Sequence, residues 1–282
     1  MTTATQEKPT ETVEAKPFTL AKPRTAALKS GMPKDGLGIL TGLPKGGKTT
    51  LAVSIPGAIL LELERGGADR VAGWIQDVDS LETFREAVQA AAAHPDVKAI
   101  VIDSVDIFHE WTDVEVSAPF GLETVNEPQE GVNTFEVWKA IRLRYEKLVS
   151  YLKQSGKLAI LIAHSKEPKI DKDGKVIIPA GITIPGKLGG FLAAEADFIG
   201  NVYKEQVGTK TKHFLSFRGG PLGTWGSRIP EIEDKIIELP RENPWSAVEA
   251  IFNKEKVWPT ADGAPEAKKD EAVNSKKGGK LK

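Results

Sequence analysis

Cysteine is absent from the 282 residues of this chain. Its absence excludes disulfide bonds, thiolate metal sites and cysteine nucleophiles. Histidine is scarce, with four scattered residues, so a zinc centre is not expected. An excess of either charge is also missing, because 38 basic residues stand against 39 acidic ones and give a formal net charge of −1. Contact with nucleic acid would therefore depend on a local patch.

Long hydrophobic runs are missing as well. No run approaches the roughly 18 apolar residues that a membrane-spanning helix needs. The polar N-terminus MTTATQEKPTETVEAKP has no apolar core of a secretory signal. We therefore expect a cytoplasmic protein that does not contact membranes.

The length fits one domain with appendages, and 40% hydrophobic residues suffice for a sizeable core. Residues 1–23 are polar and predict a disordered arm, and residues 24–258 carry the folded domain. Residues 259–282 predict a disordered, lysine-rich tail, in which six lysines face three acids over 266–282. Such a tail either keeps the protein soluble or is a weak tether for nucleic acid or a partner.

Strand and helix patterns alternate through the domain. Strands are predicted at 36–42, 57–66, 97–106 and 157–165, and helices at 79–95 and 133–156. Apolar strands that alternate with helices predict an α/β fold, with a mostly parallel sheet flanked by helices on both faces. The segments ADFIGNVYKE and KHFLSFRG alternate more strictly and predict an antiparallel hairpin at the sheet edge.

Finer expectations concern the two helices and two long loops. The first helix is expected to be capped by Asp79. The second is expected to bury the apolar positions that recur at helical spacing, namely Phe135, Trp138, Ile141, Tyr145, Leu148 and Leu152. The acidic stretch 106–131 and the Gly- and Pro-rich stretch 165–190 are interpreted as loops.

A phosphate-binding loop follows the first strand. The stretch GLPKGGKT matches G-x-x-x-x-G-K-[ST] without a gap. Its glycines let backbone N–H groups approach phosphate oxygens, and the helix that follows adds a positive dipole end. Lys48 would reach the β- and γ-phosphates of ATP, and the Thr49 hydroxyl would bind Mg²⁺. The predicted nucleotide-binding residues are Gly42, Leu43, Pro44, Lys45, Gly46, Gly47, Lys48, Thr49 and Thr50.

Acidic residues end two neighbouring strands. Asp103 follows the apolar run AIVI, where a carboxylate can hold Mg²⁺ through a water. Ser104 follows it, where many P-loop motors carry the glutamate that polarises the attacking water. The catalytic base must then come from elsewhere, or hydrolysis is absent. Glu64 is favoured over Glu62 because it projects further beyond the strand's carboxyl end, the side on which α/β sheets bind ligands.

His164 ends the strand LAILIA. At that sheet edge an imidazole could contact the γ-phosphate and report its presence to the following loop. A lone histidine is as readily structural or merely exposed. The sensing role therefore stays a hypothesis that depends on placement.

The 165–190 loop carries five lysines that could follow a phosphate backbone: Lys166, Lys169, Lys172, Lys175 and Lys187. Acids are interleaved with them, and the loop has no aromatic residue for base stacking. On this chemistry alone, a solvated hairpin over 169–178 is favoured.

The order GLPKGGKT, LLELERGG, IVIDSVD, ILIAHSK resembles the RecA-like ATPase core, over roughly residues 24–240. More closely, the chain looks like the phage-encoded RecA-like ATPases, some of which are single-strand-annealing recombination proteins. The resemblance implies a RecA-like P-loop NTPase fold, ATP and Mg²⁺ as ligands, Glu64 as base and His164 as phosphate sensor. It also implies that the loops after the third and fourth strands face DNA.

The resemblance further implies a homo-oligomer, because a basic residue of a neighbouring subunit often completes hydrolysis in this class. Lys212 and Arg228 are the first candidates for that basic finger. The implied activity is a DNA-stimulated ATPase that acts on single-stranded DNA in phage recombination or replication, with a single-strand-binding or replication protein as a further partner. Two alternatives stay open: a nucleotide-gated binding module or loader with little hydrolysis, and a P-loop small-molecule kinase.

Overall fold

The computed structural model describes residues 24, 29, 31–127, 129–173, 176–178, 180–220 and 223–253. The predicted arm 1–23, the tail 259–282 and Lys175 lie outside the described residues. Contacts divide the chain into two units, 1–30 and 31–282, and the fold described below belongs to the second.

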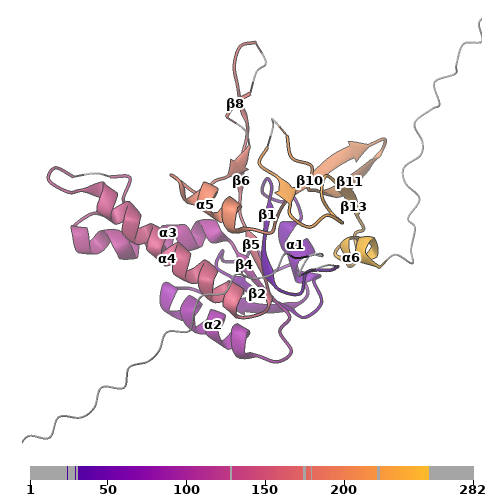
Figure 1. Ribbon diagram of the computed structural model, residues 1–282, viewed down its shortest axis with the longest axis horizontal. Helices are drawn as coiled ribbons and strands as arrows, with labels where there is room; N and C mark the ends of the chain where they lie inside the picture. Colours follow the sequence, from indigo (N-terminus) through magenta and orange to yellow (C-terminus); the bar gives the residue numbers. More distant parts are fainter. Residues whose placement is uncertain are drawn as a thin grey trace, which may run out of the picture. The chain divides into compact units, whose positions relative to one another are not determined.

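One nine-stranded sheet forms the centre of this unit (Figure 1). Its order is β13-β11-β10-β1-β5-β4-β2-β3, with β12 also paired to β10. The strands are β1 Gly36–Thr41, β2 Ala58–Glu62, β3 Trp74–Asp77, β4 Ala99–Asp103, β5 Leu158–Ile162, β10 Phe198–Val207, β11 Lys210–Ser216, β12 Gly226–Ser227 and β13 Ile236–Leu239. The pairings from β10 through β1, β5, β4 and β2 to β3 are parallel, whereas those of β11, β12 and β13 are antiparallel. The predicted fold class, including the antiparallel hairpin, is confirmed.

Helices cover both faces of the sheet. They are α1 Lys48–Val53, α2 Leu81–Ala93, α3 Val105–Ser117, α4 Thr134–Gln154, α5 Leu188–Glu195 and α6 Ser246–Phe252, with a 3₁₀ turn at Ala118–Phe120. Side chains alternate along each strand, so β4 directs Ile100 and Ile102 to one core and Val101 to the other. One core packs against α2, α3, α4 and α5, and the other against α1 and α6, as the grouping of these helices in Figure 1 also shows.

The stretch 106–131 is not the loop that the sequence predicted, because α3 occupies Val105–Ser117. Its buried positions include Val105, Phe108 and Val116, which pack on the same core as α4. The acidic residues stand between these apolar positions in the sequence, so the apolar stripe of a helix was not recognised from the sequence. Burial of these apolar side chains in the core therefore stabilises a helix that the acidic composition of the stretch disfavours.

Two further helix expectations need correction. The cap of α2 is Ser80, not Asp79, because the Ser80 hydroxyl accepts from the Thr83 amide and the Thr83 hydroxyl from the Ser80 amide. In α4, Ile141, Tyr145 and Leu152 are buried as predicted, but Phe135 is 71% exposed. The side of α4 that faces the core also carries Val137 and Val149, and both are buried.

Two short ladders replace the predicted loop at 165–190. Strands β6 Ser165–Lys166 and β9 Gly181–Ile182 pair directly after β5. Further out, β7 Lys169–Ile170 and β8 Val176–Ile178 form an antiparallel hairpin, as expected over 169–178. This hairpin extends away from the main sheet (Figure 1).

His109 gives stability a pH dependence. It lies in α3 with 6% of its surface exposed, and neither ring nitrogen has a hydrogen-bond partner among the described residues. Burial lowers the pKa of His109, although Asp113 and Asp106 oppose this. His109 therefore binds a proton more readily in the unfolded chain than in the folded protein. Its effect leaves the free energy of unfolding at its full value above the unfolded pKa of about 6.5 and lowers it below that pH.

We therefore expect the unfolding midpoint to drop between about pH 7.5 and about pH 5.5, and His109→Leu to flatten that drop. Thermal unfolding across this range measures it. The matched control is His94→Leu, since His94 is exposed and should keep the wild-type slope. Parallel curves for wild-type and His109→Leu would contradict the prediction.

Candidate active site

The loop between β1 and α1 has the backbone that phosphate binding requires. Gly42 has φ +147°, and a Cβ there would meet the carbonyl of Val202 in β10. Gly47 has φ +105° and is the N-cap of α1, with no side chain bonded to its amides and no acid in the first turn. The N–H groups that open α1 are therefore left for an anionic ligand.

Lys48 is held at the mouth of this loop. Its side chain is 6% exposed, and Nζ donates to the carbonyls of Gly42 at 2.9 Å and Leu43 at 3.0 Å. Burial lowers the pKa of Lys48, whereas the charges of Asp103, Asp106 and Glu64 raise it. The ammonium therefore lies against the loop carbonyls and is desolvated, which strengthens its attraction for phosphate.

Thr49 and Asp103 meet across 54 residues of sequence. The Thr49 hydroxyl donates to Oδ2 of Asp103 at 2.6 Å, at the carboxyl end of β4. Burial raises the pKa of Asp103, and the bond from Thr49 opposes that rise. No group of three or more His, Asp or Glu side chains able to hold a metal occurs among the described residues. This hydroxyl and carboxylate suit Mg²⁺, which takes few protein ligands and fills its remaining positions with phosphate oxygens and water.

Strand order places His164 between these two parts. Strand β5 lies between β1 and β4, and His164 follows its end, so it emerges between the phosphate loop and Asp103. The His164 amide donates to Oδ2 of Asp106 at 2.9 Å, and its Nδ1 lies 3.2 Å from the same oxygen. Sequence reasoning missed Asp106. Its signal was an acid three residues after Asp103, in the first turn of a helix.

The two glutamates after β2 have different surroundings. Glu62 is 8% exposed, and its Oε1 accepts from the Ala68 amide at 2.7 Å, which ties down the following turn. Glu64 is exposed and lies near Asp103, whose carbonyl accepts from the Leu63 amide at 2.7 Å and whose pKa the Glu64 charge raises. Ser104 is fully buried and joined to Asp103 by a cis peptide bond. Of the two glutamates, Glu64 is thus the one whose carboxylate has no hydrogen bond to another described residue.

Residues 37–229 match the family described as the AAA domain. The chain belongs to this family. The match spans the phosphate loop, Asp103, His164 and the β10–β11 hairpin. Together with the phosphate loop and the sheet, it makes the protein an AAA-type P-loop ATPase domain, a class that binds nucleotide and usually Mg²⁺.

A solved structure is also similar to this AAA domain. It is a KaiC-like protein from the hyperthermophilic archaeon Pyrococcus horikoshii, 16% identical, with 76% of this chain and 89% of that chain covered and a TM-score of 0.41. None of the curated proteins matches the sequence.

The structure separates the lysines that the sequence grouped together. Lys166 is exposed on β6 beside the phosphate loop, whereas Lys169 and Lys172 lie on the projecting hairpin. Lys187 is the N-cap of α5 and lines a different cavity with Phe191 of α5. These lysines therefore do not form one continuous track.

The two candidates for a basic finger both have partners within the chain. Lys212 Nζ lies 2.9 Å from Oε2 of Glu238 on β13. Arg228 Nη2 donates to the carbonyl of Ala194 at 2.6 Å. Either side chain would have to leave this partner to reach a neighbouring subunit.

A cleft of about 350 Å³ lies against the outer side of the phosphate loop of this AAA domain. Its walls are residues 43–46, residues 165–168, residues 201–204 and Trp225. Three lysines line it, Lys45, Lys166 and Lys204, together with the aromatic rings of Tyr203 and Trp225. Sequence reasoning missed this cleft, because its aromatic residues come from β10 and from the segment before β12.

His213 of β11 was missed as well. Its Nδ1 would lie 3.2 Å from a Cβ placed on Gly47, so the imidazole packs against the loop backbone. Burial lowers the pKa of His213, and the charge of Lys204 lowers it further. Nothing in the local sequence marked this residue, because only the pairing of β11 with β10 brings it to the loop.

Proposed function

We propose that this protein hydrolyses Mg-ATP and acts on single-stranded DNA, as a phage-type annealing or strand-pairing ATPase in recombination or replication. The observation that carries the proposal is the meeting of Lys48, Thr49, Asp103 and His164 at one sheet edge, next to Glu64. Each of these side chains has a separate task in phosphoryl transfer.

In the proposed reaction, the loop amides and Lys48 bind the phosphates and balance the charge that develops on the γ-phosphoryl group. Thr49 and Asp103 would hold Mg²⁺, which when bound would supply Lewis-acid stabilisation of the phosphate oxygens. Glu64 accepts a proton from the attacking water, the task that Ser104 cannot perform. Free phosphate and ADP are the expected products.

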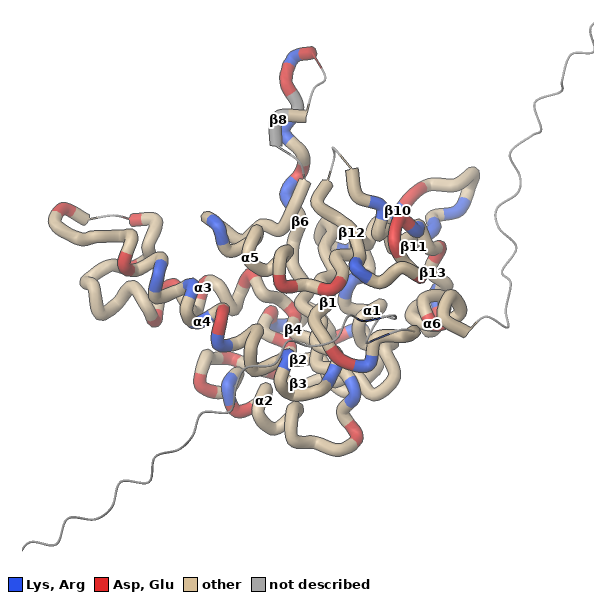
Figure 2. Tube along the Cα trace, in the orientation of Figure 1, with Lys and Arg blue, Asp and Glu red and all other residues tan. Residues whose placement is uncertain are grey.

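The cleft beside the phosphate loop supports the DNA part of the proposal. Single strands bind where cations follow the backbone and aromatic rings receive bases. Lys45, Lys166 and Lys204 supply the cations, and Trp225 and Tyr203 supply the rings that the 165–190 segment lacks. The projecting hairpin is less suited, because acids and lysines alternate on it (Figure 2).

A coupling route links the nucleotide to this cleft. With Nδ1 of His164 beside Asp106, Nε2 is the ring nitrogen that remains for a phosphate oxygen. The His164 carbonyl accepts from the Thr183 amide at 2.9 Å, and β6 begins at the next residue. A displacement of His164 would therefore move both β6 and β9. Because Lys166 lies on β6, this lysine of the cleft would move as well. DNA affinity can change only if the two loop states differ in energy.

Phosphate release from ATP tests the proposal, measured with and without single-stranded DNA at two salt concentrations and with Lys48→Ala as the blank. We expect stimulation by DNA that weakens with salt, because phosphate contacts release counterions. Hydrolysis that ignores DNA would contradict the DNA part and favour a nucleotide switch for a protein partner. Phosphorylation of an added small molecule, with no free phosphate, would identify a kinase instead.

His164→Ala is expected to abolish the ATP dependence of DNA affinity while ATP affinity stays within about twofold. The reason is that the side chain would transmit the state of the γ-phosphate without supplying most of the nucleotide contacts. Fluorescence anisotropy of a labelled oligonucleotide, with ATP and with ADP, measures it. His94→Ala is the matched control, since His94 lies at the other end of the strands, before β4. Unchanged coupling in His164→Ala would rule out the sensor role.

A second candidate is a nucleotide-gated binding module with little hydrolysis. The observation that favours it is Ser104, whose buried hydroxyl has no hydrogen-bond partner among the described residues and no acid function. A module of this kind would bind Mg-ATP and change DNA or protein affinity without turnover.

A further inference from the structure

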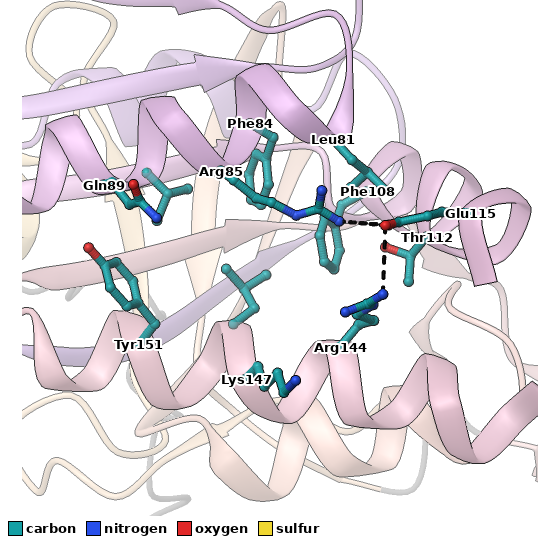
Figure 3. Close-up of a pocket in the computed structure, with 12 residues that line it drawn as sticks. Leu81, Phe84, Arg85, Gln89, Phe108, Thr112, Glu115, Arg144, Lys147 and Tyr151 are labelled. Carbon is teal, nitrogen blue, oxygen red and sulfur yellow. Dashed lines mark hydrogen bonds and ion pairs between the residues drawn. The ribbon is translucent and has the colours of Figure 1, made fainter.

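A groove lies between α2 and α4, with α3 as its floor (Figure 3). Its volume is about 240 Å³, below the roughly 300–1,000 Å³ of typical small-molecule sites. It has room for one or two side chains. None of the nucleotide-site residues lines it.

The inner surface of the groove is apolar and rigid. Phe84 of α2 and Phe108 of α3 are 2% and 5% exposed, and their ring centroids lie 5.1 Å apart. Val88 and Leu148 complete the apolar lining. Both rings are almost fully covered, so only a small part of each is open to a ligand side chain.

The rim of the groove carries positive charge. Three cations, Arg85, Arg144 and Lys147, and one carboxylate, Glu115, line it. Arg85 Nη2 donates to both Glu115 oxygens, at 2.9 and 2.7 Å, whereas Arg144 lies 3.6 Å from Glu115. Figure 3 shows both arginines reaching toward Glu115 from opposite helices. Glu115 therefore neutralises Arg85 best and Arg144 in part, which leaves Lys147 and part of the Arg144 charge for an incoming anion.

One buried polar group at the groove is also unsatisfied. Thr112 of α3 is 1% exposed, and its hydroxyl has no hydrogen-bond partner among the described residues. Native structures rarely leave such a group unpaired. Thr112 lines the groove near Glu115, but its hydroxyl oxygen has almost no exposed surface, so an occupant could reach it only if the floor of the groove moved.

We propose that this groove binds a short acidic peptide of a partner protein. One apolar side chain of the peptide packs over Phe84, Phe108 and Leu148, and its carboxylates pair with Arg144 and Lys147. Charge complementarity selects this occupant over nucleic acid, because the narrow apolar floor offers no track of cations for a phosphate backbone. An apolar anchor with a charged rim is the arrangement by which peptide-binding grooves obtain both affinity and specificity.

The test uses the full chain and a fluorescein-labelled peptide with acidic residues around one phenylalanine and one leucine. Register variants shift the acids relative to the phenylalanine. Two control peptides carry lysine for each acid, or alanine for both apolar residues. We expect at least one acidic register to raise the anisotropy and to bind at least about tenfold more tightly than either control. Binding should weaken with salt.

Two exposed positions test the site without disturbing the core. Lys147→Glu and Tyr151→Ser should each weaken binding, the first by about tenfold or more. Lys139→Glu reverses the same charge on α4, outside the groove and 72% exposed, and should bind as wild-type does. Basal phosphate release should be unchanged in all three variants, which separates this proposal from the proposed function.

Several outcomes would overturn the proposal. One is equal binding of the lysine peptide, and another is failure of every acidic register. A third is loss of binding in Lys139→Glu to the same extent as in Lys147→Glu. Displacement of the peptide by single-stranded DNA, with oligonucleotide affinity lost in Lys147→Glu, would assign the groove to nucleic acid instead.

Discussion

Glu64→Gln is expected to lower kcat for ATP hydrolysis by about 10²–10⁴-fold, the usual contribution of a general base. The amide keeps the size of the side chain but cannot accept a proton from water. The affinity for Mg-ATP should stay within about twofold, because Glu64 is exposed and, among the described residues, forms no hydrogen bond with the phosphate loop, although its charge acts on Lys48. Single-turnover phosphate release and binding of a fluorescent ATP analogue measure the two quantities separately.

Glu62→Gln is the matched control for this prediction. Glu62 lies two residues earlier, but its carboxylate already accepts from the Ala68 amide, a bond that the glutamine oxygen can keep. Hydrolysis should therefore stay within about threefold of wild-type, since no proton transfer is lost. A larger loss in Glu62→Gln than in Glu64→Gln would make Glu62 the base. Wild-type turnover in Glu64→Gln would leave hydrolysis without a base at this strand and favour the nucleotide-gated module.

Lys48→Met is expected to lower hydrolysis by about 10³-fold or more, because it removes the buried ammonium that lies against the phosphate loop. It should not destabilise the free protein. Lys48 is buried against its own loop carbonyls, and burial lowers its pKa, so the folded state bears a desolvation cost that methionine avoids. The unfolding midpoint without nucleotide should be equal to that of wild-type or higher.

Thermal unfolding with Mg-ATP completes the measurement. Wild-type should gain about 2.7 kcal/mol when ATP is present at a hundredfold excess over its Kd, and Lys48→Met should gain almost nothing. A midpoint that drops without nucleotide would show that Lys48 holds the loop together rather than serving the ligand. Full stabilisation by Mg-ATP in Lys48→Met would contradict its role in phosphate binding.

How well the sequence predicts the structure differs from element to element. Strands β1, β4 and β5 could be predicted because each is a short apolar run bounded by turn residues, and α4 because its apolar residues recur at helical spacing. Helix α3 could not be predicted, because acids stand between its apolar positions and the helix is stabilised only by packing against α4. Strands β3 and β13 escaped because they are four-residue edge strands whose existence depends on a neighbour.

The sequence by itself determined the phosphate loop, the acid that ends β4 and the α/β class. These are local properties: spacing, periodicity and turn chemistry act over fewer than about twenty residues. Only the tertiary structure decided which strands are neighbours. By inserting β5 between β1 and β4, it placed His164 between the loop and Asp103, joined it to Asp106, brought His213 onto Gly47, and set Tyr203 and Trp225 beside Lys166. Contacts between distant segments follow from the packing of whole faces, which no single stretch of sequence encodes.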